Sequence, residues 1–183
     1  MFPKSYLHPD GTPVHPEPEP DEIAIIEVPE GGGLIDSPPH LQARHVTWRE
    51  FRHRVAVLSE AFRRKGIKAN DRVASISANT PTPICILLAL NSIGAIYSLI
   101  ATDSGPEAIY SRLSQIRPKL ITTDDGVIYN GKPVNVLGRV QEVAARLARD
   151  GKIDDAANFE VVIMRNGRFP GEKPQWTSDE VKG

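Results

Sequence analysis

Cysteine is almost absent from this chain of 183 residues, in which Cys85 is the single example. One cysteine excludes an internal disulfide and a zinc site built on a cysteine cluster, and it is typical of a reducing compartment such as the cytoplasm. A basic excess is also absent, because 22 Lys and Arg residues face 23 Asp and Glu residues. This balance excludes a nucleic-acid or anionic-membrane surface as the main role, since both need clustered positive charge.

Long hydrophobic runs are scarce, and only one stretch has the length of a membrane span. Residues 84–101 carry no charge over 18 positions, which is just enough to cross a bilayer as a helix. Pro81 and Pro83 suit a helix start and Gly94 suits a helix end, so the stretch divides into a buried helix and a buried strand. We therefore expect no membrane span, and the first residues show neither a secretory nor a transit signal.

Composition divides the chain into three parts. Residues 1–20 are rich in Pro and Glu and have little apolar periodicity, which predicts a disordered tail. Residues 166–183 lose periodicity again and are predicted to be a connector or a frayed end. The intervening residues 21–165 are numerous enough to form one domain with its own core.

The clearest helix signal begins at Thr47. Thr47 and Glu50 have the spacing of a capping box, in which each side chain satisfies a backbone donor of the first turn. Gly66 supplies a left-handed stop at the other end. The apolar stripe between them has helical spacing and consists of Phe51, Val55, Leu58 and Phe62. A second capping box is predicted at Ser104 and Glu107.

Strand and helix signals alternate after Gly66. Strands are predicted at residues 72–77, 95–100, 119–123 and 159–164, and helices at 81–91, 104–117 and 136–147. A further strand is expected at 23–28, and a hairpin around 127–129. This order predicts βαβ units, and therefore an α/β fold with a mostly parallel sheet and helices on both faces.

Ligands of such sheets bind beyond the carboxyl ends of the strands. Here that edge comprises the loops 78–83 and 102–106 and the hairpin 124–132, which contain no Walker sequence, dinucleotide fingerprint or nucleophile elbow. Asp124 and Asp125 could hold a metal, but their place just before a glycine favours a turn with local hydrogen bonds. The residues alone thus indicate a binding domain with no catalytic or metal site.

Several short motifs, in this order, resemble those of the AMP-forming acyl-CoA synthetases, the adenylate-forming ligases. Residues 47–51 resemble the family's Thr-aromatic-x-Glu-Leu helix start, and residues 66–73 resemble Gly-Val-x-x-Gly-Asp-Arg-Val with Asn70 in place of the usual Gly. Asn79-Thr80-Pro81-Thr82 resembles Asn-x-Pro-Glu and departs from it at Thr82. The series continues through residues 92–98, 112–119, 125–132 and 176–180, and within the family it looks most like the acetoacetyl-CoA synthetases.

The resemblance implies the N-terminal subdomain of such a ligase. Intact relatives join a short (oxo-)acid to coenzyme A through an acyl-adenylate and need ATP and Mg. The family's phosphate loop, adenine-binding segment, ribose-binding Asp and catalytic lysine have no counterpart in these residues. We therefore expect a truncated ligase-like protein with little or no activity alone, whose partner would be a longer synthetase or the missing C-terminal portion.

One residue carries over as a candidate ligand contact. In relatives, basic residues near the hairpin that corresponds to residues 127–132 approach the nucleotide end of coenzyme A. Lys132 occupies the matching position and is a candidate phosphate contact, and the alternative is a lysine solvated beside an Asn-Gly turn. For the whole chain, the alternative is a non-catalytic α/β binding or interaction module, or a remnant, derived from such a ligase. A soluble monomer with a cooperative melt would favour that module.

Overall fold

The computed structural model describes residues 19–32, 42–129 and 132–165. At its centre lies a four-stranded sheet in the order β4-β3-β5-β8, in which every neighbouring pair is parallel. The four strands are β3 (Arg72–Ile76), β4 (Ile96–Ile100), β5 (Leu120–Asp124) and β8 (Glu160–Met164). The predicted α/β fold is confirmed. The predicted tail and the predicted C-terminal connector lie almost entirely outside the described residues.

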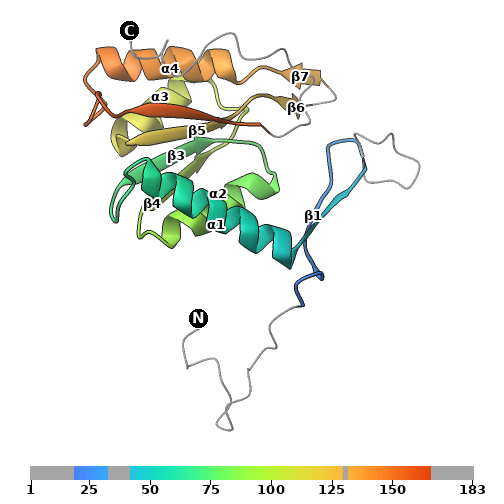
Figure 1. Cartoon of the computed structure of the whole chain (residues 1–183). Coiled ribbons are helices and arrows are strands. Elements are labelled where there is room, and N and C mark those ends of the chain that lie inside the picture. The colour runs from blue at the N-terminus through green and yellow to red at the C-terminus, as the bar shows by residue number, and fades with distance from the viewer. Residues whose placement is uncertain (1–18, 33–41, 130–131, 166–183) are drawn as a thin grey trace.

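Four helices cover the two faces of this sheet, as Figure 1 shows. They are α1 (Trp48–Arg64), α2 (Pro81–Asn91), α3 (Pro106–Ile116) and α4 (Leu137–Arg149). Helices α1 and α2 form one apolar layer with the sheet, and α3 and α4 form the other. Central strands of a parallel sheet are buried on both faces, which explains why β3 contains no exposed residue.

The uncharged run at residues 84–101 is divided between α2 and β4. Gly94 lies between them with φ +81°, a conformation that favours glycine, and a Cβ there would lie 3.2 Å from the Cβ of Ala69. Within the described ranges, each helix is too short or too polar to cross a bilayer.

Two small antiparallel pairs flank the main sheet. Strand β1 (Ile23–Glu27), which was predicted, pairs with β2 (Arg44–Thr47), which was not. Strands β6 (Val127–Tyr129) and β7 (Lys132–Val134) form the predicted hairpin directly after β5. Both pairs lie toward the right-hand side of Figure 1, where β3 and β5 end.

One predicted capping box is confirmed and the other is wrong. At α1, the Glu50 N–H donates to Thr47 Oγ1 and the Thr47 N–H donates to Glu50 Oε2, each at 3.2 Å. At α3 the N-cap is Gly105, which provides no side-chain cap. Pro106 occupies the first helical position, where proline is favoured, and so Glu107 falls at the second. The Glu107 carboxylate pairs with Arg146 of α4 instead.

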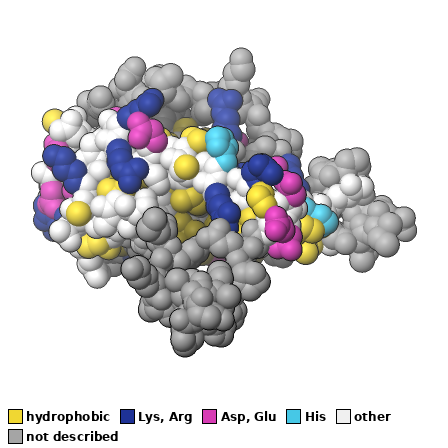
Figure 2. All heavy atoms as spheres, turned by 60° about the horizontal axis from the view of Figure 1, so that its bottom comes forward, with side chains coloured by type: hydrophobic (Ala, Val, Ile, Leu, Met, Phe, Trp, Pro, Cys, Tyr) yellow, Lys and Arg dark blue, Asp and Glu magenta, His cyan; other side chains and the backbone are white. Residues whose placement is uncertain are grey.

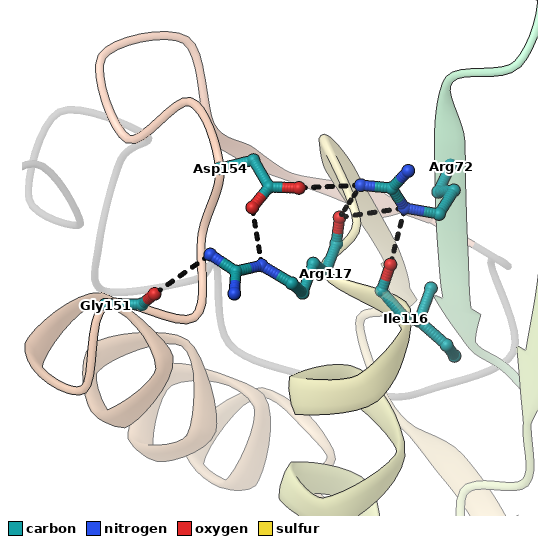
Figure 3. Close-up of polar contacts among 5 residues, drawn as sticks. All are labelled: Arg72, Ile116, Arg117, Gly151 and Asp154. Carbon is teal, nitrogen blue, oxygen red and sulfur yellow. Dashed lines mark hydrogen bonds and ion pairs between the residues drawn. The ribbon is translucent and has the colours of Figure 1, made fainter.

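The amino-terminal edge of the sheet is fastened by an ionic cluster, which Figure 3 shows in close-up. Arg72, at the start of β3, donates to the carbonyls of Ile116 at 2.6 Å and of Arg117 at 3.2 Å, and it pairs with Asp154 at 2.7 Å. Arg117 ends α3 in the left-handed conformation with φ 49° and also pairs with Asp154. Its guanidinium donates to the Gly151 carbonyl at 3.1 Å. Arg72 thereby satisfies carbonyls that the end of a helix leaves open.

This geometry predicts that Arg72 contributes more to the free energy of unfolding than Asp154 does. Asp154→Ala removes two ion pairs between half-exposed side chains and should lower the free energy of unfolding by at most about 1 kcal/mol, an effect that salt reduces. Arg72→Ala also strips the carbonyls at the end of α3 and should cost about 1–2 kcal/mol. Urea unfolding at low and high salt measures both, and equal losses would contradict the capping role of Arg72.

Candidate functional site

The carboxyl ends of the parallel strands meet at one edge, as expected for a ligand site in this fold. Strand β3 runs into residues 77–80, which lead to α2, and β5 ends at Asp124 just before the β6–β7 hairpin. A hydrogen bond joins the two loops, because the Ala78 N–H donates to Asp124 Oδ2 at 2.7 Å. The structure thus brings two of the three predicted loops into contact.

Asp124 is the most unusual residue at this edge. Its side chain is fully buried, and this burial raises the pKa of the carboxyl to about 6 because the charged form loses its hydration. The hydrogen bond from Ala78 opposes the rise, and the neighbouring charge of Asp125 adds to it. The Ser77 hydroxyl lies near the carboxyl and also lowers its pKa, but no hydrogen bond of regular geometry joins the two groups.

Three buried side-chain oxygens at this edge have no hydrogen-bond partner among the described residues. They are Asp124 Oδ1, Ser77 Oγ and Thr80 Oγ1, and we call Ser77, Thr80 and Asp124 the carboxyl-end cluster. Thr80 is the N-cap residue of α2, yet its hydroxyl makes no capping hydrogen bond. Nearly all buried polar groups in native proteins are paired. The cluster is therefore a concentration of unmet hydrogen bonds at the edge where ligands of this fold bind.

Polar side chains continue from the cluster into the sheet. Ser75 and Thr122 are fully buried and share a hydrogen bond between their hydroxyls. Burial raises the pKa of Tyr97, and the Ser75 hydroxyl partly offsets this. Nearer the amino end of the strands, Val73 and Leu120 keep the same layer apolar. The face of the sheet on the α1–α2 side thus changes from apolar to polar toward its carboxyl edge, whereas the opposite face keeps Ile76 and Ile100 there.

The interpretation of Asp124 as a turn residue with local hydrogen bonds is wrong. It is the last residue of β5, and the hydrogen bond that its carboxyl accepts comes from Ala78, 46 positions away in sequence. The glycine at 126 suggested a local turn, and the sequence contains no local pattern that indicates the pairing of β5 with β3. The useful signal was position: an acidic residue that directly follows a run of buried strand residues lies at the carboxyl edge of a parallel sheet.

The described cations near this edge include Lys132, Arg139 and Arg165, of which Arg165 is exposed directly after β8. Lys132, the predicted coenzyme A contact, lies at the start of β7 opposite Tyr129, with an exposed side chain. Arg139 of α4 donates to the carbonyls of Thr102 at 2.9 Å and Ser104 at 3.1 Å. Arg139 is thus committed to holding the loop after β4, whereas Lys132 has no ion pair with any described residue.

Cys85 lies inside the α1–α2 layer, as predicted from its apolar neighbours. It is 1% exposed and packs with Val46 and Phe51. Burial raises the pKa of the thiol, which keeps it protonated and unreactive.

The described residues fit the cofactors of an adenylate-forming reaction only in part. A triphosphate needs several cationic or backbone donors and a divalent ion, and the carboxyl-end cluster offers an acidic group and two hydroxyls instead. No three potential metal ligands come together within the described ranges. Lys132 supplies one exposed positive charge, which suits a single phosphate. Among the described residues, the arrangement can accept hydrogen bonds and contact a phosphate, which is only part of the donor set that ATP and Mg²⁺ require.

Comparison with known proteins yields a family and several relatives. The AMP-binding enzyme family matches residues 15–180. The acetoacetyl-coenzyme A synthetase of Rhizobium meliloti is 43% identical over 117 residues, which are 64% of this chain and 18% of the relative. The malonamoyl-CoA synthetase of Penicillium aethiopicum is 37% identical over 136 residues, covering 74% of this chain and again 18% of the relative. The chain thus spans about a fifth of the length of the relatives that it matches.

A solved structure agrees with these relatives. The acetoacetyl-CoA synthetase from Streptomyces lividans matches with a TM-score of 0.69 and 28% sequence identity, over 85% of this chain and 21% of that one. The family match covers most of the sequence, and the structural match covers most of the fold. The chain therefore belongs to the AMP-binding enzyme family, and it matches only a portion of the longer synthetases in that family.

Proposed function

We propose that this chain is the N-terminal α/β layer of an acid–CoA ligase, and that it has little or no ligase activity alone. The single observation that carries this proposal is the coverage: a match over 85% of this chain at a TM-score of 0.69 corresponds to only 21% of a synthetase. The carboxyl edge of the sheet supports it, since the described residues there supply only part of the donor set that ATP and Mg²⁺ require. The remaining donors would come from the rest of a ligase.

The substrate class follows from the names of the relatives. Acetoacetyl and malonamoyl groups are both short acyl groups with a second carbonyl at the β-position. In the proposed reaction, the acid carboxylate attacks the α-phosphorus of ATP and releases pyrophosphate. The coenzyme A thiol then attacks the acyl carbon, forms a thioester and releases AMP. Within this scheme we propose Lys132 as a contact for a phosphate of coenzyme A.

The test of the proposed function compares the chain alone with the chain completed by ligase residues. The complementing protein is the Rhizobium meliloti synthetase without the stretch that this chain matches. We expect acetoacetate-dependent AMP release from the mixture, and none above background from either part. AMP release by the purified chain alone would contradict the lack of activity. A mixture that stays inactive although both parts are folded would contradict the ligase role.

A second candidate is a non-catalytic binding module derived from such a ligase. One observation favours it: both faces of the sheet are covered by buried apolar clusters, one of 15 residues and one of eight. Such a core can support independent folding. A monomer with a cooperative melt, combined with an inactive mixture, would favour this module over the ligase.

Lys132 has a sharp kinetic prediction in the completed ligase. Lys132→Ala should raise the KM for coenzyme A about 5–10-fold, because a charge-assisted hydrogen bond to phosphate is lost at an exposed site. The KM values for ATP and the acid should stay unchanged. Lys68→Ala is the matched control, since Lys68 is also exposed but precedes β3 at the other end of the sheet. Equal effects of the two variants on the KM for coenzyme A would contradict the proposed contact between Lys132 and coenzyme A.

A further inference from the structure

Helix α2 is apolar on its outer side as well as its inner side. Ile84, Leu87 and Leu88 have the i, i+3, i+4 spacing of one helix face and are 42%, 38% and 39% exposed. The helix contains no charged residue. A helix at the surface of a globular protein normally carries polar residues on its solvent side, and a helix that is apolar all round is buried. The sequence of α2 is thus that of a helix covered on both sides.

Strand β4, which packs against α2, is an edge strand without the usual protection. In the described part of the chain it pairs only with β3, in regular register, and its other edge is open. Natural edge strands are guarded by Lys, Pro or a bulge, but β4 reads Ile-Tyr-Ser-Leu-Ile. Leu99 lies opposite Ser75, so its side chain is on the α1–α2 side of the sheet, and it is 48% exposed.

These four residues, Ile84, Leu87, Leu88 and Leu99, form what we call the α2–β4 face. The neighbouring helix shows how an outer surface of this chain is otherwise built. Its exposed positions are largely charged, and they include Arg52, Arg54, Glu60, Arg63 and Arg64. Figure 2 looks onto the α1–α2 side and shows hydrophobic side chains between scattered Lys and Arg side chains. Among the described helices, α2 is therefore the one whose outer surface lacks charge, although β1 also exposes large hydrophobic residues such as Ile23 and Ile26.

We propose that the α2–β4 face packs against the remaining portion of an AMP-binding ligase, which adds a strand to the edge of β4 and an apolar layer to α2. This proposal rests on the proposed function. The length of the relatives identifies the occupant, because about four-fifths of each synthetase lies outside the stretch that this chain matches. Backbone hydrogen bonds at the β4 edge and burial of the α2 side chains are the two contributions that such an element would make.

The experiment co-expresses the chain with the tagged Rhizobium meliloti synthetase that lacks the matched stretch, and measures soluble complex by affinity capture and size exclusion. Leu88→Lys and Leu99→Lys test the two parts of the face, since each would bury an unpaired charge in the contact. Both positions are exposed in the free chain, so both variants should fold, and circular dichroism melts verify this. Ile26→Lys is the matched control, because Ile26 is 58% exposed on β1, away from β4.

We expect a 1:1 complex with the wild-type chain and with Ile26→Lys, and at least a tenfold loss of complex with each of the other variants. A complex that survives both Leu88→Lys and Leu99→Lys would overturn the proposed face but leave the ligase role intact. A wild-type homodimer that these variants dissociate would assign the face to a second copy and overturn the proposal. Absence of both complex and ligase activity with every variant would instead overturn the proposed function.

Discussion

Replacing Asp124 by Asn will stabilise the protein at neutral pH. Burial raises the pKa of the Asp124 carboxyl to about 6, whereas an Asp in an unfolded chain has a pKa of about 3.9. As pH rises from about 4 to about 6, the unfolded state loses its proton before the folded state, so the free energy of unfolding falls by up to about 3 kcal/mol. Above pH 6 both states are ionised and this contribution stays constant.

Asn keeps the shape of the side chain and cannot ionise. Its amide oxygen can still accept from the Ala78 N–H, and its amide nitrogen can donate to the Ser77 hydroxyl, which has no partner among the described residues. We therefore expect Asp124→Asn to be about 1–3 kcal/mol more stable than wild type near pH 7.5, and equal to it within about 0.5 kcal/mol near pH 4. Urea unfolding at a series of pH values measures the difference.

Asp125→Asn is the control for this prediction. Asp125 follows Asp124 directly, and its charge contributes only a smaller part of the rise in the Asp124 pKa. This variant should therefore keep most of the pH dependence. If Asp124→Asn instead weakens the protein near pH 7.5, the ionised carboxylate is stabilised by a donor or a cation that neutral Asn cannot satisfy.

The buried carboxylate also marks this edge as a candidate site. An ionised group that destabilises the fold is typical of a site in which function is favoured over stability. Within the described residues, polar atoms of the carboxyl-end cluster lack hydrogen-bond partners and the apolar side chains of the α2–β4 face lack a covering layer. Each is understandable if the chain works as one layer of a larger enzyme.

The sequence predicted the regular part of the fold because that part follows local rules. The apolar stripe of α1 and the Thr47–Glu50 capping box are set by residues three or four positions apart, and both are confirmed. The alternation of strands and helices indicated the parallel sheet for the same reason. Strand β2 was not predicted because it is four residues long, has two exposed residues, and runs directly into the α1 cap.

The candidate site depended on contacts that no local pattern contains. Asp124 becomes part of the candidate site only because β5 pairs with β3 and the Asp124 carboxyl accepts a hydrogen bond from the Ala78 N–H. The capping box of α3 was predicted one residue too early, at Ser104. Pro106 occupies the first helical position, so the N-cap is Gly105. Lys132 was reached through the family resemblance, and its contact with coenzyme A stays a prediction.

Phe62→Ala is expected to have the largest effect on stability. Phe62 lies in the last turns of α1, is 4% exposed, and packs in one cluster with Val73, Leu90 and Leu120. Deleting a buried phenyl ring removes hydrophobic burial and leaves a cavity, which together cost about 3–5 kcal/mol. Since domains of this size unfold with about 5–15 kcal/mol, the variant should be close to its stability limit at 37 °C.

The consequence reaches the α2–β4 face, because α1 and α2 form one layer with the sheet. Loosening of α1 should also loosen α2. Phe62→Ala should therefore both lower the urea concentration at the unfolding midpoint and reduce capture by the remaining portion of the ligase. Val57→Ala, on the same helix but 54% exposed, should change stability by less than about 0.5 kcal/mol and leave capture intact. A loss below about 1 kcal/mol for Phe62→Ala would show that α1 is not held by this core. Docking would then depend on α2 and β4 alone.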